Sequence, residues 1–126
     1  MSTRRFDVLL DDKKIGWTFL ENADAPMGVV TGRIYFIDID SGYGFLKAYC
    51  EEHCIEIITE NPDQQLIATS AMAPLSVVSP EGIEIKGQSV NIEGMDQDYF
   101  EIFILGIPYP FFEQQFGHHV NKYRGE

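Results

Sequence analysis

The chain has 126 residues, of which 44% are hydrophobic and 23% are charged, and its formal net charge at pH 7 is −11. This length and this apolar content predict a single globular domain over residues 1–126 and exclude a disordered chain. The negative charge disfavours nucleic-acid binding, because phosphate backbones are repelled, and no apolar run approaches the ~20 residues of a membrane-spanning helix.

The beginning of the chain bears on where the protein resides. Residues 1–5 are basic at Arg4 and Arg5, but the apolar run that follows ends at Asp11. That run is too short for the hydrophobic region of a secretory signal. We therefore expect a cytoplasmic protein that does not associate with a membrane.

The first third of the chain predicts three strands and a loop. Residues 6–10 and 15–20 are apolar-rich runs around a polar turn, and the second run alternates with period two, which is typical of a half-buried strand in a hairpin. This alternation predicts that Trp17 and Phe19 lie in the core. Residues 21–26 read as a loop ending at a proline, and residues 28–37 as a strand whose Gly32 indicates a bulge or a close backbone approach.

The middle and end of the chain predict one helix among further strands. Ser41 can cap a helix, and apolar residues spaced four apart extend that helix from about residue 43 to 54. Turn residues separate the later apolar runs, which we expect to form strands at 66–69, 75–78, 82–86, 89–93 and 99–105. Residues 111–116 favour a short helical turn before a loose tail. The predicted fold is α+β: a mostly antiparallel sheet of about six to eight strands, one main helix near 43–54 and a short C-terminal helical turn.

The acidic residues are concentrated in one region of the sequence. Between Ala48 and Val120 the single lysine or arginine is Lys86, against twelve acids, which are Glu51, Glu52, Glu56, Glu60, Asp63, Glu81, Glu84, Glu93, Asp96, Asp98, Glu101 and Glu113. Such a region can be a docking face for a basic partner, since opposite charge accelerates encounter. It can equally be a surface that keeps the protein soluble.

Three soft ligands share one face of the predicted helix. Cys50, His53 and Cys54 stand at positions i, i+3 and i+4, a spacing that could bring them to one metal ion. The same face continues the apolar stripe from Leu46, and a closed zinc site needs a fourth ligand. We therefore expect core packing here, and no metal or cofactor in the protein.

Six residues are candidates for a binding site. Glu21 and Asp24, with Arg33 a short way along, could form an acid–base site or an ion-pair network, although loop-fixing hydrogen bonds are the commoner use of such residues. Met27 lies in the same loop. His118 and His119 are the remaining candidates; on an extended segment their side chains would point to opposite sides, with one packed and the other exposed.

Several segments resemble a family of uncharacterised small bacterial proteins. The shared motif has a similar hairpin, then Leu-Glu, Asp-x-Pro-Met-Gly and Gly-Arg, which here are found in residues 16–21, 24–29 and 32–33. Residues 106–110 and 116–120 are also similar, although the family tends to have a proline where Gly117 stands. The resemblance implies a bacterial origin and a conventional small domain, and it implies no activity.

Three hypotheses about function follow. The first is a non-enzymatic protein-interaction module, with a toxin-neutralising immunity protein as one example and a basic protein as its partner. The alternative is a small-molecule binder or enzyme with a site between the 21–28 loop and the 116–119 segment, in a pocket lined by Trp17, Met27 and Phe116. The third is a homodimer that pairs through aromatic surface at Tyr109, Phe111 and Phe112.

Overall fold

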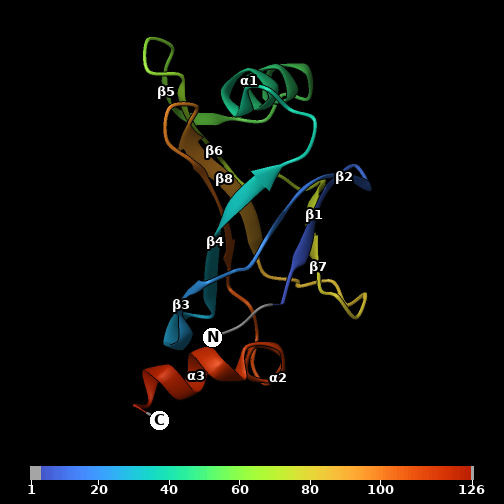
Figure 1. Cartoon of the computed structure of the whole chain (residues 1–126), viewed down its shortest axis with the longest axis vertical. Coiled ribbons are helices and arrows are strands. Elements are labelled where there is room, and N and C mark those ends of the chain that lie inside the picture. Colours follow the sequence, from blue (N-terminus) through green and yellow to red (C-terminus); the bar gives the residue numbers. More distant parts are fainter. Residues whose placement is uncertain (1–3, 126) are drawn as a thin grey trace.

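A computed structural model describes residues 4–125. Within them the chain forms an antiparallel sheet of nine strands with one main helix and two short C-terminal helices (Figure 1), which confirms the predicted α+β class. The strands run in the order β5-β6-β8-β9-β4-β2-β1-β7, and β3 pairs with β4. Their bounds are β1 Phe6–Leu10, β2 Lys13–Thr18, β3 Asn22–Asp24, β4 Val29–Phe36, β5 Ile57–Asn61, β6 Leu66–Thr69, β7 Leu75–Val78, β8 Ser89–Met95 and β9 Phe100–Leu105.

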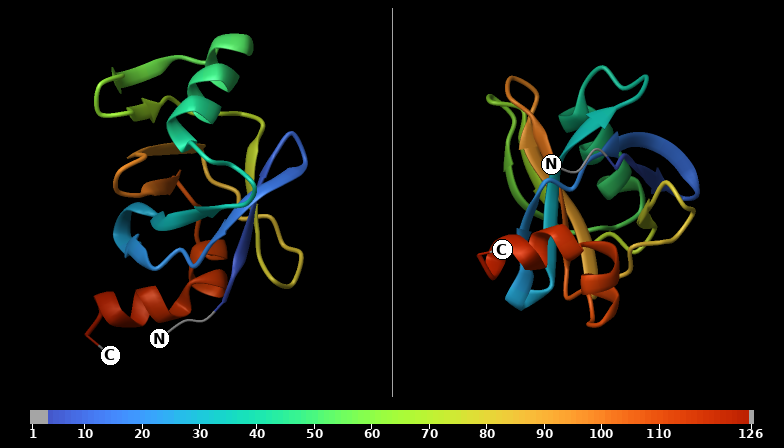
Figure 2. Two further views of the ribbon diagram at one scale, coloured as in Figure 1. Left: turned by 45° about the horizontal axis from the view of Figure 1, so that its top comes forward. Right: turned by 60° about the horizontal axis from the view of Figure 1, so that its bottom comes forward.

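The helices occupy the two ends of the molecule. α1 (Gly42–Glu52) lies beside β5 and β6 at one end, whereas α2 (Phe111–Gln115) and α3 (Gly117–Tyr123) lie together at the other (Figure 2). The Ser41 side chain caps α1 by accepting a hydrogen bond from the Gly44 N–H at 3.0 Å, as predicted. No helix in the described part of the chain is both long enough and apolar enough to cross a membrane.

The core lies on one face of the sheet and forms one cluster of buried side chains. Leu46 and Cys50 of α1 are fully buried in it, and Phe112 and Phe116 are buried in it at the opposite end. Phe6 stacks on Phe116 with ring centroids 5.8 Å apart, which joins the first strand to the C-terminal helices.

A bulge in the β1–β2 hairpin decides which residues of β2 face the core. Val8 pairs with Gly16 but Leu9 pairs with Lys14, so Ile15 is an extra residue on the β2 side. The side-chain alternation therefore changes phase at Ile15, and Thr18 becomes an inward, fully buried residue.

The predicted burial of Trp17 and Phe19 is wrong for this reason. Both side chains are half-buried on the outer face of the sheet, where the Trp17 ring stacks on Tyr35 at 4.2 Å between centroids. The Arg5 guanidinium lies 3.8 Å from the centre of the Trp17 ring. The rings of Trp17 and Phe19 therefore form part of the outer surface of the sheet and not part of the core.

The two edges of the sheet differ. Residues 83–85, predicted as part of a strand, form only an isolated bridge, yet they cover the edge of β7: the Ile85 N–H donates to the Val77 carbonyl at 2.8 Å. At the other edge, the register of β5 shifts between Ile57 and Thr59. Ile58 consequently projects outward and is 64% exposed. An irregular edge of this kind resists uncontrolled strand pairing.

The C-terminal segment is more ordered than expected. The predicted helical turn is confirmed as α2, but the histidine pair, expected on an extended segment, begins α3, which continues to Tyr123. Buried contacts of Phe116 and Val120 hold this short helix against the core, and tertiary packing of this kind outweighs a weak local preference.

Candidate functional site

Residues 17–22 form a second bulge, opposite β4. Trp17 pairs with Tyr35 and Asn22 pairs with Thr31, so five residue steps on the β2–β3 side face four on β4. Leu20 takes up the extra length with a positive φ of 47°. Residues 22–24, predicted as loop, resume pairing after it as β3.

Polar side chains satisfy the backbone groups that this bulge leaves without a strand partner. Glu21 accepts a hydrogen bond from the Arg33 N–H at 3.0 Å, and His119 Nε2 donates to the Leu20 carbonyl at 2.9 Å. Thr18 Oγ1 accepts from the Leu20 N–H at 3.2 Å. Glu21 and His119 thus have structural roles that connect β4 and α3 to the bulge.

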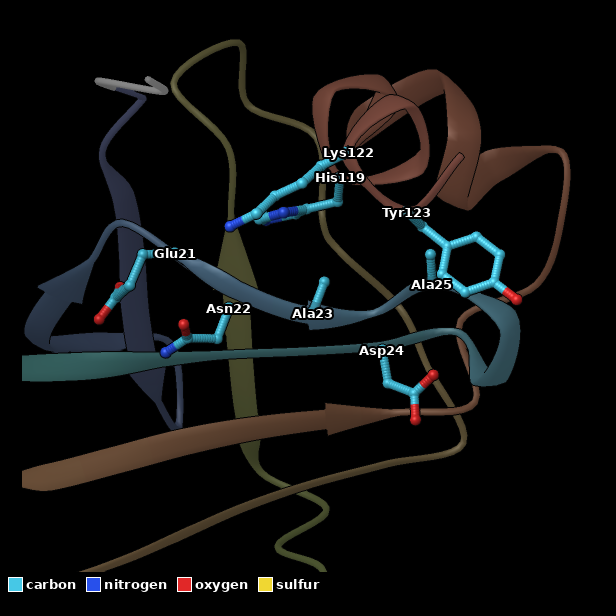
Figure 3. A pocket seen from close by; sticks show the side chains of 8 residues that line it. All are labelled: Glu21, Asn22, Ala23, Asp24, Ala25, His119, Lys122 and Tyr123. Carbon is cyan, nitrogen blue, oxygen red and sulfur yellow. The ribbon is translucent and has the colours of Figure 1, made fainter. Parts of the chain in front are cut away.

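A groove runs between β3 and α3 and brings together the two segments of the small-molecule hypothesis. Its volume is about 480 Å³, and its lining residues are Glu21, Asn22, Ala23, Asp24, Ala25, His119, Lys122 and Tyr123. Figure 3 shows the side chains of Ala23 and Ala25 on the side of the strand that faces α3. From α3, the side chains of His119 and Lys122 extend toward the strand.

The acidic side chains do not join His119 in this groove. Figure 3 shows Glu21 and Asp24 pointing to the side of the strand away from α3. His119 is 8% exposed and its Nε2 is engaged with a backbone carbonyl, and among the described residues no carboxylate bonds to it as the partner of a general base would. The groove can hold a small molecule against Lys122 and Tyr123, but it lacks the histidine–carboxylate pair of an acid–base site.

The other candidate residues lie outside this groove. Met27, on the η1 turn (Ala25–Met27), is 67% exposed, and the guanidinium of Arg33 lies 5.2 Å from the ring centre of Tyr35. His118 is exposed, as expected for one of the two histidines, and its ring centroid is 4.1 Å from that of His119. The pKa of His118 is lowered, chiefly because the imidazole is desolvated and to a smaller extent because of the neighbouring charge of His119.

The pocket predicted from Trp17, Met27 and Phe116 is not formed. Trp17 lies on the outer face of the sheet, Met27 projects outward and Phe116 is fully buried in the core. The first bulge turns Trp17 outward, whereas Met27 lies on the η1 turn and Phe116 lies between α2 and α3, so the three side chains have different surroundings. The lining of the groove comes instead from residues 21–25 and from His119, Lys122 and Tyr123 of α3.

The soft-ligand cluster of the helix is also dispersed. Cys50 is fully buried, Cys54 is exposed beyond the end of α1 with a φ of 57°, and the His53 ring stacks on Tyr49 at 4.1 Å. Burial raises the pKa of the Cys50 thiol. Across residues 4–125, no group of three or more histidine, cysteine or acidic side chains is placed to hold a metal ion.

The proposed dimer surface is smaller than the sequence indicated. Phe112 is fully buried and Phe111 is half-buried, which leaves Tyr109 as the exposed ring at 47%. The Tyr109 hydroxyl donates to the Ala25 carbonyl at 2.5 Å, so this residue also holds the segment before α2 against η1.

The strongest charge asymmetry is at the end of the molecule that holds α1. Here α1, β5 and the β4–α1, β5–β6 and β8–β9 connections lie together at the top of Figure 1. Within these residues (37–63 and 95–99) Lys47 is the single lysine or arginine. We call this region the acidic end, and its nine acids are Asp38, Asp40, Glu51, Glu52, Glu56, Glu60, Asp63, Asp96 and Asp98.

Two of these acids fasten α1 to the sheet. Asp96 accepts from the Ser41 hydroxyl at 2.5 Å and from the Tyr43 N–H at 2.9 Å. Glu60 pairs with Lys47 Nζ at 2.8 Å and accepts from the Tyr43 hydroxyl. Hydrogen bonds from Lys47 and then Tyr43 lower the pKa of Glu60. Glu60 is the one acid of the nine that forms an ion pair with a described residue, so the other eight leave the acidic end strongly negative.

Comparisons of the chain with protein-family models, with curated proteins and with solved structures found no match. The resemblance of residues 16–33 to small bacterial proteins therefore stays a prediction. The geometry of the chain itself has to support any assignment of function.

Proposed function

We propose that this protein is a non-enzymatic protein-interaction module that binds a basic protein through its acidic end. The observation that carries this proposal is the concentration of nine acids around Lys47 at one end of the molecule. A negative potential of this kind attracts a basic surface and raises the rate of encounter. Neutralisation of a toxin domain is one form that such an interaction can take.

Two further features support an interface at this end. Ile58 is 64% exposed on β5, which gives the charged surface an apolar contact point. The Lys47–Glu60 pair joins α1 to β5, and Asp96 joins the start of α1 to the β8–β9 connection, so the surface is preorganised before binding.

The proposal is tested with basic proteins encoded beside this gene, by measuring binding at 50 and 300 mM NaCl. We expect binding at low salt that weakens at high salt and falls in a variant with E51Q, E52Q, E56Q and D63N. The matched control neutralises four acids elsewhere, with D12N, D24N, E84Q and E113Q, and should bind as the unmodified chain does. No binding at 50 mM NaCl, or equal weakening by both variants, would contradict the proposal.

A second candidate function is a small-molecule binder, because the groove between β3 and α3 joins the two segments that this hypothesis requires. Lys122 supplies a positive charge and Tyr123 a ring at its rim. Filling the groove by Ala23→Leu should abolish any ligand-induced rise in the melting temperature, whereas Met27→Leu, outside the groove, should preserve it.

A further inference from the structure

The outer face of the sheet carries a second groove, beside the acidic end. It has a volume of about 360 Å³, and its lining includes Leu66, Ala68, Glu93, Asp98, Tyr99 and Glu101. We call it the sheet-face groove. Its lining combines three carboxylates, one aromatic ring that is 42% exposed and a floor of small and apolar side chains.

Strand register places two of the carboxylates directly opposite each other. Glu93 of β8 pairs with Glu101 of β9, so both side chains project from the same face of the sheet. Like charges at directly opposed positions destabilise a sheet. Arg33 is opposite Glu101 on the next strand, yet its guanidinium lies over the rings of Tyr35 and Tyr99. Glu101 accepts a hydrogen bond from the Thr31 hydroxyl at 3.3 Å, but neither glutamate forms an ion pair with a described residue. A cation supplied from outside the chain would therefore stabilise the Glu93–Glu101 pair.

The other lining residues specify what kind of cation fits. Ala68 pairs with Glu93 and Leu66 pairs with Met95, which gives an apolar floor long enough for a methylene chain. The Tyr99 ring already accepts a guanidinium on its surface, since Arg33 lies 5.3 Å from its centre. A planar guanidinium also matches paired carboxylates with two parallel hydrogen bonds, which an ammonium group cannot form.

We propose that the sheet-face groove receives an arginine side chain of the basic partner, with Glu93 and Glu101 binding the guanidinium and Tyr99 packing against it. This inference rests on the proposed function, because it names the side chain by which the basic partner is recognised. The groove opens beside Asp98 of the acidic end, so the charge that attracts the partner lies next to the pocket that would select its arginine.

The test titrates the isotope-labelled full chain with N-acetyl-arginine N-methylamide, which carries a single arginine side chain, and separately with the corresponding lysine compound. Binding is measured by the changes in the backbone amide chemical shifts. We expect the arginine probe to shift Ala68, Gly94 and Tyr99 and to bind more tightly than the lysine probe. In E93Q/E101Q its affinity should fall about tenfold, since two exposed charged hydrogen bonds are lost. In the control E51Q/E52Q, at the acidic end but outside the groove, its affinity should be unchanged.

A second variant keeps the test independent of charge. Ala68→Leu fills the floor of the groove without removing an acid and should also weaken the arginine probe. Shifts spread evenly over the acidic end, equal affinity for both probes, or unchanged affinity in both groove variants would overturn the inference.

Binding of the basic partner to the unmodified chain and to E93Q/E101Q distinguishes the arginine groove from the proposed function. If a basic partner binds the acidic end equally well before and after E93Q/E101Q, the arginine groove is wrong and the proposed function stands. If the arginine probe binds as expected but no basic partner binds, arginine recognition stands and the proposed function is wrong.

Discussion

Gly32 lies where the second bulge brings two strands unusually close. A Cβ atom at this position would be 2.3 Å from Thr18 Oγ1 and 2.8 Å from the Leu20 Cα, and the second of these atoms belongs to the backbone. The glycine of the Gly-Arg motif is therefore explained by space and not by catalysis. The adjoining Arg33 N–H donates a hydrogen bond to Glu21. The spacing of these two residues in the motif is therefore explained by a backbone contact, and not by a metal site or an acid–base pair.

We expect Gly32→Ala to lower the free energy of unfolding by about 2 kcal/mol, because overpacking forces the Leu20 backbone to move. Urea denaturation measures the change. Gly117→Ala is the matched control: it adds the same methyl group at the start of α3, where the new Cβ would meet no atom within 4 Å apart from its chain neighbours and the backbone of its own helix, and should be neutral or slightly stabilising. An equal loss in both variants would show that the close approach at Gly32 is not the cause.

At the scale of secondary-structure elements, α1 and β5 are joined through Glu60. Its pKa is lowered by hydrogen bonds from Lys47 and then Tyr43, so the folded state holds the proton less tightly than the unfolded chain, whose carboxyl has a pKa of 4.5. The stabilisation is therefore complete above pH 4.5 and is lost as pH falls through the lowered pKa of the folded state.

We expect Glu60→Gln to be less stable than the unmodified chain at pH 7, with a difference in the free energy of unfolding that shrinks as the pH falls below 4.5. Chemical denaturation at a series of pH values measures this difference. The neighbouring Glu56→Gln, an exposed acid, serves as the control and should show no comparable narrowing. A Glu60→Gln difference that stays constant over the whole acid range in which the protein remains folded would contradict the assigned role.

The elements that could be predicted are those specified by local chemistry. The β1–β2 hairpin follows from a polar turn, where Asp11 and Asp12 adopt positive φ values of 52° and 64° that suit a tight hairpin. α1 follows from a serine cap and apolar spacing, and it ends at Glu52, close to the predicted end. β9 follows from an apolar run bounded by turn residues.

The features that could not be predicted depend on contacts between distant residues. Each bulge adds one residue to a strand and reverses the faces of the side chains after it, so the alternation in the sequence misplaced Trp17 and Phe19. His119 bonds Leu20 across 99 positions of the chain, which no local pattern reports. The sheet-face groove was missed for the same reason, since only strand register places Glu93 opposite Glu101.

At the scale of the whole molecule, the charge is distributed unevenly. The acidic end concentrates nine of the chain's twenty acids around one lysine, and eight of the nine form no ion pair with a described residue. Mutual repulsion of these groups opposes the compact state, and dissolved salt screens it over about 10 Å at 0.1 M. A surface adapted to a basic partner should therefore reduce the stability of the free protein at low salt.

We expect the melting temperature at pH 7 to rise by about 2–5 °C between 20 and 300 mM NaCl, because screening relieves this repulsion. Differential scanning calorimetry measures the shift. The variant with E51Q, E52Q, E56Q and D63N should melt higher at 20 mM NaCl and respond less to salt. The variant with D12N, D24N, E84Q and E113Q has the same net charge but retains the acidic end, so most of its salt response should persist. Identical responses in the two variants would mean that net charge, and not its concentration beside α1 and β5, governs the stability of the free protein.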